Sequence, residues 1–87
     1  MITINGVEWE IYLVSPTHPY LIRSDGVKVL GCCDNIDKAI YINELLDNVY
    51  LKKVICHEIT HAAMFSYNVT LTHDQEELVA DLIATYG

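Results

Sequence analysis

The stretch VICHEITHAAMF, residues 54–65, places two histidines four residues apart with a glutamate directly after the first. On an α-helix, residues at this spacing share one face about a turn apart, so His57 and His61 can point at the same ion. Two neutral imidazoles suit zinc, and Glu58 between them can act as a general base on water. Random shuffling would give this pattern in roughly one sequence in eighty, so the bare spacing is a hypothesis about a metal site.

The residues around this motif predict a long helix over 48–67. The run contains neither glycine nor proline, Asp47 suits its N-cap, and Asn68 can close it. The helix is apolar on nearly every side, so we expect it to be central and buried. Buried polar groups need partners. For the motif these partners could be one zinc ion or neighbouring core carboxylates.

A second helix is predicted over 73–86, because Thr72 and Gln75 fit a capping box. Its acidic face offers Glu77 as the third zinc ligand and Asp81 as the acceptor that fixes one imidazole. Glu76, at the edge of the apolar stripe, is the second choice of ligand. The alternative is that these carboxylates only form a solvated face near a helix N-terminus. Small residues on the acidic face would let the helices approach closely, namely Ala80 and Ala84. The opposite stripe is apolar and consists of Leu78, Val79, Leu82, Ile83 and Tyr86.

Three short segments before the helices predict strands. Residues 7–14 alternate apolar and polar side chains, while 27–33 and 38–42 are apolar segments that follow the turn signals SDG and DNID. We expect the last two strands to pair antiparallel. The predicted fold is α+β, a single domain over 1–87 with a small three-stranded antiparallel sheet packed on the two helices.

Composition limits the partners and the compartment. The chain carries 12 acidic and 5 basic residues, a net charge of −7, which argues against nucleic acid and anionic membrane surfaces as partners. It favours basic or neutral peptides instead. With no secretory signal or long apolar run, we expect a cytoplasmic protein. Three cysteines, two of them adjacent, without a Cys-x-x-Cys pair indicate reduced thiols and no cysteine metal site. The high apolar share, 52%, leaves room for self-association.

The patterns His-Glu-x-x-His at 57–61 and Glu-x-x-Ala-Asp at 77–81 resemble the signature of gluzincin-type zinc metallopeptidases. The upstream stretch GCCDNIDKAIYI is similar to small ImmA/IrrE-like and phage-encoded members, and the likeness spans about 31–86. It implies a minimal peptidase domain with Zn²⁺. Relatives usually continue past the second helix, so we expect part of a lobe or a regulatory segment to be absent from this chain, and no position matches the Tyr or His electrophile of larger members. By position, the resemblance assigns His57, His61 and Glu77 as ligands, Glu58 as general base and Asp81 as the partner of a ligand imidazole.

The expected activity is hydrolysis of a peptide or protein substrate by a zinc-activated water, with Glu58 as the base. Three residues could donate to the charged intermediate, and none is preferred: Tyr41, Tyr67 and His73. His18 is expected to be an exposed loop residue. A substrate could add to the sheet edge, for which 39–42 is the favoured strand. Two alternatives remain: a zinc-stabilised regulatory or interaction module with little hydrolysis, and a metal-free domain.

Overall fold

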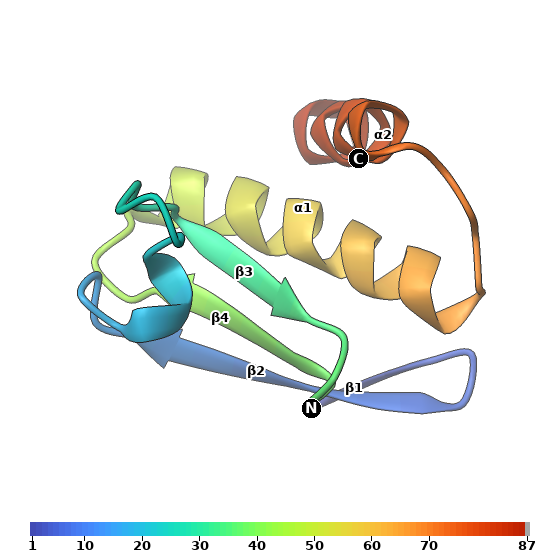
Figure 1. Cartoon of the computed structure of the whole chain (residues 1–87), viewed down its shortest axis with the longest axis horizontal. Coiled ribbons are helices and arrows are strands. Elements are labelled where there is room, and N and C mark those ends of the chain that lie inside the picture. The colour runs from blue at the N-terminus through green and yellow to red at the C-terminus, as the bar shows by residue number, and fades with distance from the viewer. Residues whose placement is uncertain (87) are drawn as a thin grey trace.

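The computed structural model describes residues 1–86, which form a four-stranded mixed sheet and two long helices in an α+β arrangement (Figure 1). Helix α1 lies over one face of the sheet, and α2 packs on α1. The helices cross, since α2 is seen nearly end-on where α1 runs across the view. In chain order the elements are β1 (Ile2–Ile4), β2 (Val7–Val14), the 3₁₀ turn η1 (Pro19–Leu21), β3 (Gly31–Asp34), β4 (Ala39–Asn43), α1 (Asn48–Ser66) and α2 (His73–Tyr86).

The prediction of a three-stranded antiparallel sheet is wrong in strand number and in direction. The sheet order is β1-β2-β4-β3, and β2 pairs parallel with β4, in the register Ile11↔Ile40. The missed strand β1 forms a hairpin with β2 through Asn5 and Gly6, which both have positive φ, 49° and 79°. Asn-Gly is a strong hairpin signal, but β1 has only three residues, too few to show a two-residue period.

The last two strands pair antiparallel as predicted, in the register Cys33↔Ile40. The predicted strand 27–33 is displaced, because the observed β3 covers Gly31–Asp34 and residues 27–30 belong to the preceding loop. The prediction that segment 39–42 is the sheet edge to which a substrate adds is wrong. This segment belongs to β4, which is paired on both sides, so the free edge beside the helices is β3.

The helix ends lie close to their predicted positions because their capping residues make the expected bonds. The Tyr50 backbone N–H donates to Asp47 Oδ1 at 3.0 Å, and Asn68 follows α1 with a left-handed φ of 55°. At α2, the Gln75 N–H donates to Thr72 Oγ1 at 3.2 Å, and the Thr72 N–H donates to Gln75 Oε1 at 3.1 Å. This reciprocal pair is the capping box.

The core holds α1 against the sheet. Trp9, Ile40, Ile42 and Ala62 are fully buried, and the Trp9 indole donates to Ser66 Oγ at 2.8 Å. The expectation that α1 is central and buried holds for its second half, where residues 57–66 are buried or half-buried, whereas its first turn, residues 48–50, is exposed. Neither helix in residues 1–86 combines the length and apolarity needed to cross a membrane.

Candidate metal centre

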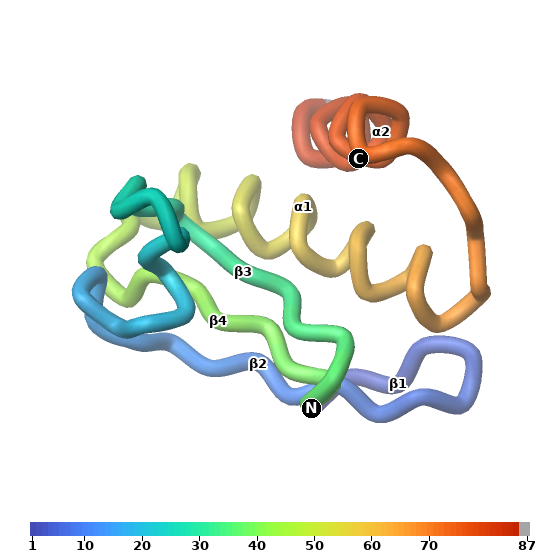
Figure 2. Tube along the Cα trace, in the orientation of Figure 1, coloured from blue at the N-terminus to red at the C-terminus, as the bar shows by residue number. Residues whose placement is uncertain are grey.

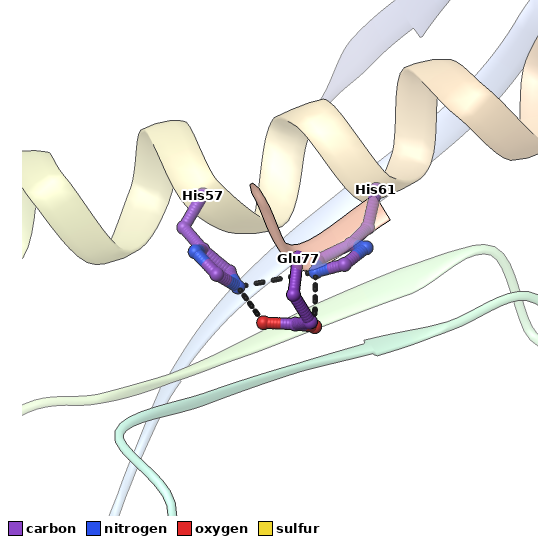
Figure 3. A group of neighbouring side chains, drawn as sticks. All are labelled: His57, His61 and Glu77. Atoms are coloured by element: carbon purple, nitrogen blue, oxygen red, sulfur yellow. Dashed lines mark hydrogen bonds and ion pairs between the residues drawn. The ribbon is translucent and has the colours of Figure 1, made fainter. Parts of the chain in front are cut away.

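His57 and His61 lie one turn apart on α1 and turn their inner nitrogens toward each other (Figure 3). The two Nε2 atoms are 3.1 Å apart. At that distance at most one of them can carry a proton, because two N–H groups facing each other would clash. At least one Nε2 therefore presents a lone pair to its neighbour, which is the form in which imidazole binds a metal.

Glu77 reaches this pair from α2 and closes the group (Figure 3). Its Oε2 lies 3.3 Å from His57 Nε2, and its Oε1 lies 3.1 Å from His61 Nε2. Ligands bound to zinc at about 2.0–2.1 Å in a tetrahedron are separated by about 3.3 Å. Each of these contacts is near that separation, with the two histidines facing different oxygens of Glu77. One atom from each residue lies within 4.8 Å of the others, so as a group they could hold a metal ion.

The outer nitrogens of both rings face carboxylates. His57 Nδ1 is 3.0 Å from Oδ1 of Asp81, which belongs to the acidic face of α2. His61 Nδ1 contacts Glu76 Oε1, so Glu76 touches the opposite side of the ring from the Glu77 carboxylate. An Nδ1–H donated to a carboxylate leaves Nε2 free to act as a metal ligand and makes it more basic. The contact of Glu76 with His61 was not foreseen, and neither helix reveals it alone because it depends on how they cross.

Glu58 lies next to this group and is buried, with 7% of its surface exposed. Burial raises the pKa of its carboxyl, His61 and His57 oppose that rise, and Glu77 adds to it. Gly31 makes room for this side chain. A Cβ at Gly31 would stand 3.1 Å from Glu58 Cγ and 2.7 Å from Val54 Cγ1, so the close approach of β3 to α1 requires glycine.

A cavity of about 890 Å³ opens in front of these residues, within the size range of ligand sites. Three successive residues of the edge strand β3, 31–33, border it. Its lining includes Arg23, Gly31, Lys53, His57, Glu58 and Glu77.

The structure separates the three candidates for an oxyanion donor. His73, at the start of α2, lines the cavity. Tyr67 and Tyr41 do not line it, and Tyr41 belongs to an aromatic cluster with Tyr12 and His18. His18 lies in a loop, as expected, but it is not fully exposed. It is half-buried, stacks on Tyr41 with ring centroids 5.3 Å apart, and accepts the N–H of Tyr20.

The cysteines are free thiols, as expected, and none belongs to the candidate metal group. Burial raises the pKa of the Cys33 thiol far above its usual range, and the neighbouring Glu58 charge adds to the rise. The pKa of Cys32 is raised by burial and Glu58 too. Both thiols therefore stay protonated at neutral pH.

Comparison with protein families, with curated proteins and with solved structures returns no match to this chain. Two imidazoles from one helix and one carboxylate from the next converge at the wall of a cavity, with a buried glutamate beside them. That group could hold a metal ion.

Proposed function

We propose that this chain is a zinc-dependent peptidase in which His57, His61 and Glu77 hold the ion. The observation that carries the proposal is the convergence of the two Nε2 atoms and the Glu77 carboxylate at 3.1–3.3 Å. Two imidazoles and one carboxylate suit zinc, and three protein ligands leave a fourth position for water. The residues present therefore fit the ion that the resemblance implies.

When bound in such a site, zinc supplies an activated water and polarises a carbonyl. The remaining chemistry belongs to Glu58, whose carboxylate takes the proton of the attacking water and returns it to the leaving amine. Its place beside His57, at the wall of the cavity, supports this role. Asp81 and Glu76 hold the two imidazoles in the orientation that keeps Nε2 toward the ion.

The substrate is proposed to be an extended peptide that adds to the free edge of β3. An edge strand offers unpaired N–H and C=O groups, and pairing with them aligns a peptide without regard to its side chains. This edge borders the same cavity as Glu58, because residues 31–33 line it. The scissile bond would then lie within reach of the base.

A Glu58→Gln variant tests the proposal against the same change at the exposed Glu8, which lies outside the cavity. Each protein is assayed for zinc content and for hydrolysis of an unfolded protein. A peptidase loses hydrolysis in Glu58→Gln while zinc stays at the level of the unmodified chain, and Glu8→Gln keeps both. Equal hydrolysis by the two variants would contradict the role of Glu58.

The second candidate function is a zinc-stabilised interaction module with little hydrolysis. It is supported by the outer face of α2, where four apolar side chains are exposed: Leu78 61%, Val79 36%, Leu82 49% and Ile83 44%. Such a stripe on a surface helix is typical of a face that packs on another protein. Zinc binding without hydrolysis of any unfolded substrate would favour this function.

A further inference from the structure

Two cationic side chains line the candidate active-site cavity. The chain has only 5 basic residues and a net charge of −7, yet Arg23 and Lys53 both border this one cavity. Arg23 comes from the loop before β3, where its N–H donates to Val27 O at 2.8 Å, and Lys53 comes from α1. In Figure 2, the loop that contains Arg23 lies beside the first turns of α1.

Neither cation is neutralised by a strong partner. The Arg23 guanidinium is 4.0 Å from Asp25, and the two side chains are 63% and 56% exposed, so this pair is weak. Among residues 1–86, Lys53 forms no ion pair. Carboxylates also line the cavity, but three of them contact the histidine rings and the fourth is the buried Glu58. Both cations are therefore available to an anionic group in the cavity.

The position of Lys53 relative to the candidate metal group follows from helix geometry. Lys53 is four residues before His57 on α1, so it shares the face of His57 about 6 Å toward the N-terminus. An extended peptide advances about 3.3 Å per residue, so this separation corresponds to about two residues of substrate. The cation can therefore reach a group one or two residues from the scissile bond.

The direction of a bound peptide decides whether the cations lie on the N-terminal or the C-terminal side of the scissile bond. Figure 1 shows β3 and α1 running in the same general direction, with Gly31 at the start of the strand. A peptide that pairs antiparallel with β3, the slightly more stable arrangement, runs the other way. Its residues on the C-terminal side of the scissile bond then approach Gly31 and the cations.

We infer that Arg23 and Lys53 form a carboxylate-binding subsite, which selects an acidic side chain or a free C-terminus one or two residues after the scissile bond. The inference rests on the proposed peptidase function. It reverses the expectation, drawn from net charge alone, that basic or neutral peptides are preferred. The two cations lie close to the bound peptide. The negative charges on the rest of the surface are farther away, and solvent ions screen them over about 8–10 Å.

Binding measurements test the subsite without depending on hydrolysis. Three fluorescent peptides of one backbone sequence are compared: one with glutamate after the expected scissile bond and an amidated end, one with glutamine and a free C-terminus, and one with glutamine and an amidated end. They are titrated against the unmodified protein and the Glu58→Gln variant in zinc. The matched pair of charge variants is Arg23→Gln/Lys53→Gln, within the cavity, and Lys28→Gln/Lys52→Gln, outside it.

We expect at least one carboxylate peptide to bind about three- to tenfold more tightly than the neutral one, an advantage that shrinks with added salt. Arg23→Gln/Lys53→Gln should abolish it and Lys28→Gln/Lys52→Gln should keep it. Whichever carboxylate peptide binds more tightly shows whether the subsite recognises an acidic side chain or a free C-terminus. Equal binding of all three peptides, or no binding, would overturn the subsite. Failure of the peptidase function has a different signature, namely no hydrolysis of any peptide while the binding preference persists.

Discussion

His57 Nε2 and His61 Nε2 face each other at 3.1 Å, while the Nδ1 atom of each ring faces a carboxylate from α2. Contacts with α2 thus hold the outer nitrogen of each imidazole. A hydrogen bond to the outer nitrogen fixes the orientation of a metal-binding imidazole. Glu77 faces the inner nitrogens, whereas Asp81 and Glu76 contact only the outer ones.

The two adjacent glutamates of α2 should differ in their effect on zinc affinity. Glu77→Ala removes a proposed ligand, so we expect affinity to fall by more than the about 10- to 100-fold typical of losing an imidazole partner. Glu76→Gln keeps a side-chain amide that can contact His61 Nδ1, so we expect its loss of zinc affinity to lie within or below that range. Competition titration against a zinc chelator measures both. A larger loss in Glu76→Gln than in Glu77→Ala would reverse the assignment.

Removing the ion should destabilise the fold. Binding to the native state alone adds stability by mass action, and the proposed ligands come from both helices, so the ion would add a link between α1 and α2. We expect a chelator to lower the Tm of the unmodified protein and to leave the Tm of His57→Ala/His61→Ala nearly unchanged. Thermal unfolding followed by circular dichroism gives both values. Equal shifts in the two proteins would point to an effect of the chelator elsewhere.

Gly31→Ala should destabilise the protein by about 1–3 kcal/mol, as overpacking in a core does. The added Cβ would stand 2.7 Å from Val54 Cγ1, and a β-branched valine has little freedom to move away. Urea unfolding measures the change. The double variant Gly31→Ala/Val54→Ala should show a smaller loss than the sum of the single changes, because the clash disappears. Full additivity would mean that the two residues do not collide.

Cys33 should react slowly with iodoacetamide in the folded protein. Its raised pKa means that the thiol keeps its proton well above neutral pH, and the thiolate is the reactive form. Unfolding removes the burial and restores ordinary reactivity. Mass spectrometry of timed, digested samples at pH 8 follows the modified peptide with and without denaturant. Equal rates in the two conditions would contradict a buried, protonated thiol.

Local signals made the helices and the candidate ligands predictable. Asp47 and Thr72 mark helix starts through bonds to residues three positions away, and the four-residue spacing of the histidines places them on one face. The parallel pairing of β2 with β4 could not be read in this way, because it joins segments about 30 residues apart. The contact of Glu76 with His61 likewise depends on the crossing of two helices.

Zinc content of the purified protein is the most direct test of whether His57, His61 and Glu77 hold an ion. The chain is expressed in zinc-containing medium, freed of loosely bound metal by gel filtration and analysed by inductively coupled plasma mass spectrometry, with His57→Ala/His61→Ala beside it. We expect about one zinc per unmodified chain and almost none in the variant. Absence of zinc from the unmodified chain, or equal zinc in both proteins, would contradict it.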